Sequence, residues 1–128
     1  MQPKPHGHYT IEWQGDILHV HPRGNFNEYG IINLKETVLS KIAGHEKWVL
    51  FEHPVNKAGI IPEAIHELAK AYNEYQQQGC ILVIMEVPSV FGAAIKAEVD
   101  KLSNIPLYFS TDPNHLAQIA QDALNHSV

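Results

Sequence analysis

The chain has 128 residues, of which 45% are hydrophobic and 18% are charged, and these proportions are ordinary for one globular domain. Its net charge is −5, with nine Lys and Arg scattered among fourteen Asp and Glu, which excludes the clustered basic face that nucleic-acid binding needs. The single cysteine, Cys80, excludes an internal disulfide framework and favours a reducing compartment. Apolar runs of about seven residues are too short to cross a bilayer, and the first eight residues contain no apolar signal segment. We therefore expect a cytoplasmic protein with no transmembrane segment.

The first strands are expected close to the start of the chain. Residues 1–8 are rich in Pro, Gly and His and are predicted to form a flexible tail, so that the domain spans 9–128. Apolar and polar residues alternate over 9–14, which is typical of a half-buried strand. Residues 14–16 indicate a turn, and 17–21 form a second strand. Together these segments predict an antiparallel hairpin.

Strands and helices alternate from residue 27 onwards. Asn27 is an expected N-cap, and Gly44 is expected to stop the helix that follows it. Residues 48–51 predict a short buried strand, and Pro62 suits the first turn of a second helix. The inward-facing residues expected on these two helices are Ile31, Leu34, Val38 and Ile42, and then Ile65, Leu68, Ala69 and Tyr72.

The second half of the chain continues this alternation. Residues 81–87 are apolar on both faces except for Glu86, so they predict a strand at the centre of the sheet that is covered on both sides. A helix follows 88–89, a last strand covers 106–109, and Asp112 with Pro113 caps a final helix. The inward-facing residues expected on these helices are Phe91, Ile95, Val99 and Leu102, and then Leu116, Ile119, Ala120 and Ala123.

The resulting order is β-β-α-β-α-β-α-β-α, which predicts a single α/β domain built on a mixed β-sheet. Strands separated by helices pair in parallel through right-handed crossovers, whereas the opening hairpin is antiparallel. A flavodoxin-like domain begins directly with strand and helix, so the hairpin weighs against that alternative.

Two segments carry a resemblance to a known family. The step from the second strand into the first helix, 24–27 (Gly-Asn-Phe-Asn), resembles the corresponding step in STAS domains. The closing segment 106–112 (Pro-Leu-Tyr-Phe-Ser-Thr-Asp) resembles the SpoIIAA-like group of these domains, which is also called STAS/SEC14-like. The resemblance covers nearly the whole chain, and it implies a SpoIIAA-like scaffold with a regulatory role.

The best-known mechanism of that family does not transfer to this sequence. In bacterial anti-sigma antagonists of the STAS class, a loop after the third strand carries a hydroxyl that is phosphorylated. The corresponding segment here, 53–61, is expected to be a loop and contains no Ser, Thr or Tyr. A phosphate ester needs an oxygen nucleophile, so we expect no such switch in this segment.

Candidate binding residues gather where parallel strands end, which is where ligands of open α/β sheets bind. Glu52 and Glu86 are interpreted as the points at which strands emerge into solvent. The alternative interpretation of every candidate is structural, as a loop charge or a cap. The candidates for ligand or partner binding are Arg23, Asn25, His53, Asn56, Lys57, Ile60, Ile61 and Ser89.

Catalysis and metal binding have weaker support. His53 follows Glu52 in a pattern that suits a base, with Ser89 as a nucleophile, but the sequence has no Gly-x-Ser-x-Gly elbow and no Gly-rich phosphate loop. His19 and His21 project from one face of a strand, which is a geometry that can hold a metal. A plain polar strand face is the preferred interpretation of that pair. No catalytic residue, metal or cofactor is therefore assigned.

The segment before the second helix gives the best clue to partners. Ile60 and Ile61 either staple that helix onto the core or present an apolar contact. Consecutive residues entering a helix point about 100° apart, so we expect one to be buried and the other exposed. The predicted function is a non-catalytic STAS-like regulatory or protein-interaction module, including a possible homodimer. The alternative is a domain that binds a small molecule or lipid, such as a small apolar ligand, in the loops at the carboxyl ends of the parallel strands.

Overall fold

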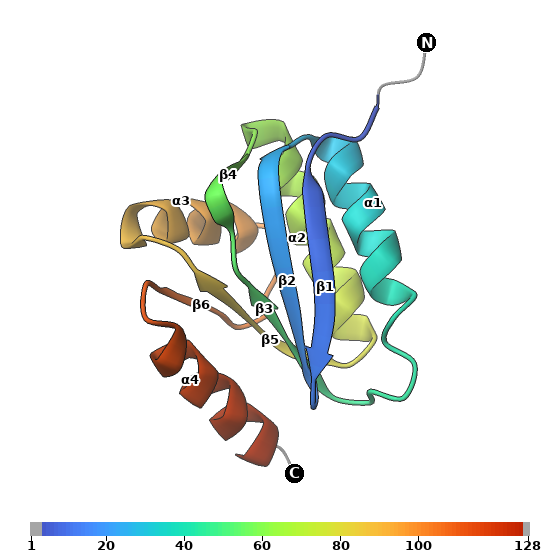
Figure 1. The fold of residues 1–128 in the computed structure, drawn as a ribbon, viewed down its shortest axis with the longest axis vertical. Helices are drawn as coiled ribbons and strands as arrows, with labels where there is room; N and C mark the ends of the chain where they lie inside the picture. Colours follow the sequence, from blue (N-terminus) through green and yellow to red (C-terminus); the bar gives the residue numbers. More distant parts are fainter. Residues whose placement is uncertain (1–3, 127–128) are drawn as a thin grey trace.

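The structure, a computed structural model, describes residues 4–126, except for the side chains of 55–58. Six strands and four helices follow the predicted alternation, with one additional strand (Figure 1). In chain order they are β1 His8–Gln14, β2 Ile17–Phe26, α1 Glu28–Leu39, β3 Trp48–Glu52, β4 Val55–Ile60, α2 Pro62–Gln77, β5 Cys80–Glu86, α3 Ser89–Val99, β6 Leu107–Ser110 and α4 Pro113–His126.

The sheet is mixed, as predicted. Its main strand order is β1-β2-β3-β5-β6, in which β1 and β2 form the antiparallel hairpin and the other neighbours are parallel. Gly15 sits in the two-residue turn of that hairpin with a φ of 59°, a left-handed conformation that favours glycine. The apolar strand β5, expected at the centre of the sheet, lies between β3 and β6, so it is an interior strand beside the middle strand β3. The hairpin places β1 at one side of the sheet.

The two faces of the sheet are covered unequally. Helices α1, α2 and α3 contribute to the main hydrophobic core on one face, whereas α4 packs on the other face against β3, β5 and β6 (Figure 1). Leu116 and Ala120 of α4 are fully buried in this second, smaller core. The hairpin strands are not among the elements on which α4 chiefly packs, so their side of this face carries polar side chains.

The segment expected to be the loop 53–61 is instead largely a strand, and that expectation was wrong. Strand β4 pairs in parallel with the end of β2, with Arg23 opposite Val55 and Phe26 opposite Ile60. Because β1 occupies the other edge of β2, β4 continues along the edge where β3 ends. Strand β2 itself runs to Phe26, beyond the expected end at residue 21. The extra residues of β2 offer backbone hydrogen-bonding partners to β4, so this segment forms a strand although its sequence predicts a loop.

Two sequence-predicted caps hold their helices. The Asn27 side chain accepts a hydrogen bond from the Gly30 amide at 2.8 Å and begins α1. It also accepts from the His6 amide at 2.9 Å and donates to the Lys4 carbonyl at 3.0 Å. At α4, the Asp112 side chain accepts from the Asn114 amide at 3.0 Å. The chain that precedes β1 is therefore joined to the start of α1.

The buried face of α3 differs from the prediction. Val99 is buried and Ile95 is partly buried, as expected, but Phe91 is 65% exposed and Leu102 is 45% exposed. The reason lies at Gly92, where an added Cβ would come within 2.3 Å of the Phe109 ring. The helix approaches β6 through this glycine, so Phe91 turns outward.

No helix within residues 4–126 is both long and apolar enough to cross a membrane.

Candidate functional site

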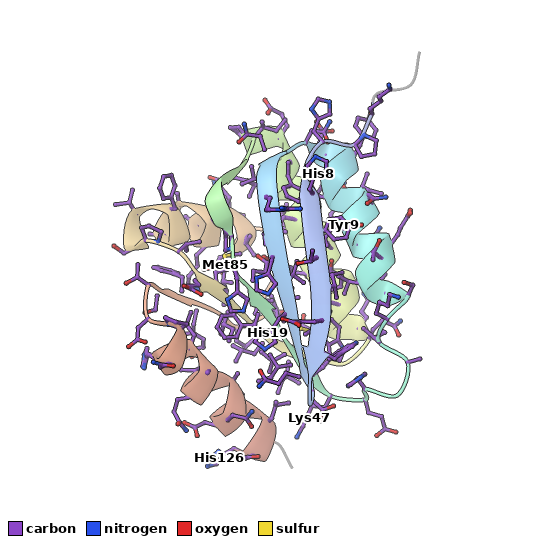
Figure 2. The ribbon with its side chains drawn as sticks, viewed as in Figure 1. His8, Tyr9, His19, Lys47, Met85 and His126 are labelled. Atoms are coloured by element: carbon purple, nitrogen blue, oxygen red, sulfur yellow. The ribbon has the colours of Figure 1, made fainter. Side chains whose placement is uncertain are left out.

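A row of hydrogen bonds crosses four strands on the face that carries α4. His19 Nδ1 lies 2.8 Å from His53 Nε2, and His53 Nδ1 lies 2.9 Å from Glu86 Oε1. At the other end, His19 Nε2 lies 3.0 Å from Gln14 Oε1. These four residues, called the histidine network below, come from the end of β1, from β2, from just after β3 and from the end of β5. Figure 2 labels His19, which lies on β2.

Strand alternation explains why these side chains meet. Side chains two residues apart share a face, so His19 lies on the face of Ile17, which belongs to the smaller core. By the same rule, His53 follows Phe51, and Glu86 follows Ile84. Each strand thus changes from apolar to polar as it passes beyond α4, and parallel pairing brings the polar positions into line.

Two neighbouring rings stack against the ring of His53. It lies 3.9 Å from the Phe51 ring at an interplanar angle of 20°, and 4.7 Å from the His21 ring at 15°. His21 Nε2 in turn lies 3.6 Å from Glu12 Oε1. With both ring nitrogens hydrogen-bonded and two rings stacked against it, only 16% of the His53 side chain remains exposed. This histidine is a rigid hub within the network.

The electrostatic environment differs along the network. Burial lowers the pKa of His19, the neighbouring His53 and His21 lower it further, and Glu12 opposes this effect. Glu86, 36% exposed, faces His53 as a carboxylate partner. Positive charge is therefore disfavoured at His19, whereas His53 lies beside the carboxylate of Glu86.

The geometry does not assemble the catalytic group considered from sequence. Glu52 turns to the opposite face from His53, where it contacts Tyr72. Ser89 is exposed at the start of α3. The carboxylate that does meet His53 is Glu86, so a histidine and a carboxylate converge without that serine.

The described residues do not form a metal-binding group around the histidines. None of their groups of three or more His, Cys, Asp and Glu is arranged to hold a metal ion. His19 and His53 face each other at hydrogen-bonding distance, whereas a zinc ion stands about 2 Å from each nitrogen that binds it. His19 and His21, the weak candidates from sequence, thus belong to a hydrogen-bonded and stacked cluster.

Glu52 corrects a sequence-based interpretation. It was expected to mark a strand emerging into solvent, yet it is buried, with a relative exposure of 8%. The Tyr72 hydroxyl of α2 lies 3.1 Å from both of its carboxylate oxygens. Burial raises the pKa of Glu52 to about 7, and the Tyr72 hydrogen bond partly opposes that shift. Alternation places this carboxylate in the main core, on the opposite face from His53.

The remaining candidates are spread along the strand ends. Arg23 and Asn25 are exposed on β2, and Asn25 lies over Gly59 of β4, where an added Cβ would come within 2.8 Å of Asn25 Oδ1. The side chains of Asn56 and Lys57 lie outside the described part of the structure. The structure brings His19, His21 and His53 into one cluster, and no hydrogen bond or ring contact links the other candidates with described side chains to it.

The two isoleucines before α2 have different environments. Ile60 is partly buried and packs against the main core, whereas Ile61, the N-cap residue of α2, is 38% exposed. Pro62 favours an extended conformation at Ile61, which has a ψ of 150°. The two side chains therefore differ in the predicted sense, although Ile60 is partly buried and not fully buried.

Exposed apolar side chains recur at the first turns of three helices. Because β2, β3 and β5 are parallel, α1, α2 and α3 all begin at the same edge of the sheet. Four exposed residues at these starts, called the first-turn surface below, are Tyr29 (42%), Ile61 (38%), Val90 (78%) and Phe91 (65%). Sequence reasoning identified Ile61 but placed Phe91 in the core.

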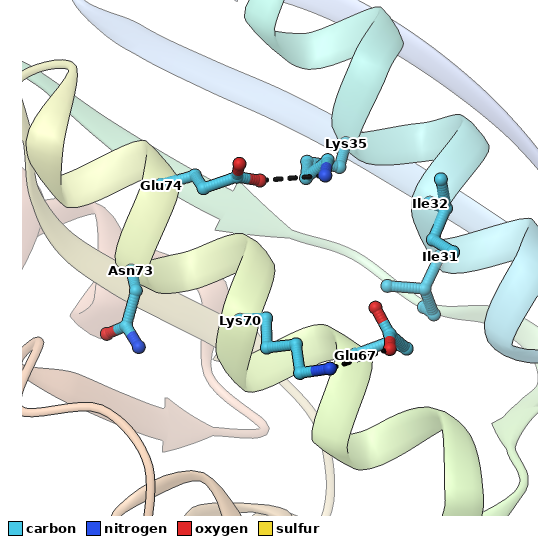
Figure 3. Close-up of a pocket in the computed structure, with 7 residues that line it drawn as sticks. All are labelled: Ile31, Ile32, Lys35, Glu67, Lys70, Asn73 and Glu74. Carbon is cyan, nitrogen blue, oxygen red and sulfur yellow. Dashed lines mark hydrogen bonds and ion pairs between the residues drawn. The ribbon is translucent and has the colours of Figure 1, made fainter.

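Two hollows lie apart from the histidine network. One, of about 280 Å³, lies between α1 and α2, where Lys35 pairs with Glu74 at 2.8 Å and Lys70 with Glu67 at 3.1 Å (Figure 3). Its charges are thus already paired with each other. The other, of about 440 Å³, runs along β6 and is lined by Lys96 and residues 106–109. The first is lined mostly by charged side chains that pair with each other, and the second has one charged side chain, Lys96, so neither resembles a mostly apolar ligand site with a few convergent polar groups.

Comparison with known proteins identifies the fold. No family model and no curated protein matches the sequence. Among solved structures, an uncharacterised protein of the DUF3478 family from Shewanella loihica PV-4 is similar, with a TM-score of 0.63 and 13% sequence identity. The match covers 94% of this chain and 98% of that one, and that protein is described as having a SpoIIAA-like fold. The sequence-based resemblance is thereby confirmed at the level of architecture: the chain has a SpoIIAA-like fold.

Proposed function

We propose that the protein is a non-catalytic regulatory module that binds another protein through its first-turn surface. The observation that carries this proposal is the exposure of Val90 and Phe91, 78% and 65%, on the opening turn of α3. Large apolar side chains that are exposed close together mark interaction sites. Aromatic residues are also enriched among the residues that dominate binding energy.

The construction of α3 supports a role for this exposure. Gly92 packs against Phe109 and holds the helix close to β6, which leaves the preceding two residues directed outward on an ordered element. A rigid element presents side chains at a lower entropic cost than a loop does. Ile61 lies at the start of α2, and α2 packs against α3.

The proposal does not involve phosphorylation of residues 53–61, which contain no hydroxyl. A cytoplasmic location suits it, because the single thiol, Cys80, is buried and its pKa is raised to about 12 by that burial. Such a thiol is inert and needs no disulfide partner.

Site-specific photo-crosslinking in cells tests the proposal. A photo-reactive phenylalanine analogue in place of Phe91 should form a discrete adduct with one protein, identified by mass spectrometry. The same analogue at Leu102, which is 45% exposed just beyond the other end of α3, is the matched control. Equal and diffuse labelling from both positions would contradict the proposal.

A second experiment identifies the kind of partner. Val90→Asp should abolish the adduct formed from the probe at Phe91, because the two residues are adjacent and both exposed on the first turn of α3. An adduct between two copies of this chain, together with a concentration-dependent sedimentation coefficient, would identify a homodimer as the partner. Native mass spectrometry of the purified protein tests the alternative, a bound small molecule or lipid.

A further inference from the structure

The histidine network contains more hydrogen bonds than two neutral imidazoles can supply. A neutral imidazole carries one N–H and one bare nitrogen. The network has three contacts, and the groups at its two ends, Glu86 Oε1 and Gln14 Oε1, are both acceptors. With Gln14 accepting through Oε1, as it does here, His53 donates at one end and His19 at the other, and the contact between the rings needs a third proton.

We propose that His19 and His53 form a proton-binding site, in which the pair holds three protons on four nitrogens and Glu86 balances the single positive charge. In this state His53 Nδ1–H donates to Glu86, and His19 Nε2–H donates to Gln14. The third proton joins His53 Nε2 to His19 Nδ1 across 2.8 Å. The site lies on different residues from the first-turn surface.

The charge is expected to reside on the ring of His53. Its Nδ1 lies 2.9 Å from the Glu86 carboxylate, which favours the charged form of the ring. His19 is the poorer site, because burial and the adjacent His53 lower its pKa. The proton between the rings is therefore donated by His53 Nε2 and accepted by His19 Nδ1.

The other groups around the pair belong to several elements. Strand β1 brings Glu12, β2 brings His21 and, two residues further along the same strand, Arg23, and α4 brings the apolar Leu116 to this face. Glu52 lies on the opposite face. Glu86 is the carboxylate that contacts a ring of the pair directly, so it should control proton binding.

The network is complete over a limited range of pH. When the pair loses one proton, two protons remain for three contacts, and one contact is lost unless Gln14 rotates its amide to donate from Nε2. When the pair gains a fourth proton, two N–H groups face each other between the rings, and that contact breaks. The pair therefore acts as a pH-sensitive device that joins the hairpin to the ends of β3 and β5 in one protonation state.

Long-range ¹H–¹⁵N NMR of the imidazole rings, recorded as a function of pH, tests the proposal directly. In the three-proton state, both nitrogens of His53 should show protonation, and proton loss from His19 and His53 should be coupled. Glu86→Gln removes the balancing charge. It should lower the upper midpoint, which is the pH at which the pair changes from three protons to two, by about one pH unit or more. The exposed His66 provides a reference titration in the same spectra.

Two further variants separate this effect from a general structural one. Gln14→Leu, at an exposed position, removes the acceptor for His19 and should lower the same midpoint by a smaller amount. Glu98→Gln, which removes a surface carboxylate on α3, should change neither histidine. Independent, ordinary titrations of His19 and His53 that neither Glu86→Gln nor Gln14→Leu alters would overturn the proposal.

Discussion

The hydroxyl of Tyr72 donates to the carboxylate of Glu52 inside the main core, 3.1 Å from both of its oxygens. Both side chains are buried. A buried carboxylate held by one neutral donor retains its proton to a higher pH than an exposed one does, which is why the pKa of Glu52 rises to about 7. Two predictions depend on this pair.

The free energy of unfolding should fall as pH rises from about 4.5 to 7, through the contribution of Glu52. In this window the folded protein keeps the carboxyl proton, which the unfolded chain, with its ordinary pKa of 4.5, has released. The folded state then binds more protons, so stability decreases with rising pH, by up to about 3 kcal/mol. Urea titrations at pH 4.5 and 8 measure the free energy of unfolding of wild type and of Glu52→Gln. The value for Glu52→Gln minus the value for wild type should be more positive at pH 8 than at pH 4.5. Glu98→Gln is the control, and an equal pH dependence in wild type and Glu52→Gln would contradict this account.

Tyr72→Phe should destabilise the protein by about 1–3 kcal/mol, because it leaves the buried carboxyl without its donor. The loss should be larger at pH 8 than at pH 5, since the hydroxyl stabilises the charged form of Glu52 more than the neutral form. Denaturant unfolding at both values measures the difference. Tyr108→Phe, at a half-exposed position on β6, supplies the matched control and should have little effect. A loss that is independent of pH would indicate packing alone.

Gly92→Ala should destabilise the protein by about 1–3 kcal/mol, although alanine is a better helix former than glycine. The new methyl group would approach the Phe109 ring to 2.3 Å, so α3 or the ring must shift. Thermal melting of this variant beside Ala93→Gly, at the exposed neighbouring position, separates propensity from packing. An increase in the melting temperature for Gly92→Ala would show that the contact adjusts without cost.

Ile60→Ala should destabilise the protein by about 1–3 kcal/mol, because Ile60 packs against the main core. Ile61→Ala should change stability by less than about 0.5 kcal/mol, since the side chain is 38% exposed. Denaturant unfolding of both variants gives the comparison. Large and equal losses would assign both side chains to core packing and remove Ile61 from the first-turn surface.

Local signals in the sequence predicted much of the fold. Asn27 and Asp112 cap the helices that follow them because a short polar side chain suffices to satisfy nearby amides. The apolar run 81–87 predicted an interior strand because such a strand is covered on both faces. These features depend on residues that are neighbours in the chain.

The errors arose where distant residues decide the outcome. Strand β4 exists because the far end of β2 offers it backbone partners, and the sequence of 53–61 does not disclose that. Phe91 and Gly92 both fit the helical spacing to Ile95, and only the Phe109 ring of β6 selects Gly92 as the packed position. The histidine network depends on which side of the sheet α4 covers, so the His19 and His21 pattern alone could not identify Gln14 and Glu86 as partners.

The three hydrogen bonds made by the Asn27 side chain determine how the protein is best attached to a surface. They hold Lys4 and His6 beside the start of α1, at the edge of the sheet where the helices begin. Helix α4, by contrast, ends at the other end of the molecule (Figure 1). Immobilisation through the amino terminus therefore brings the support close to Tyr29 and its neighbours and hinders access to them. Attachment through the carboxyl terminus leaves the same edge facing the solution, and it is the better orientation for binding measurements.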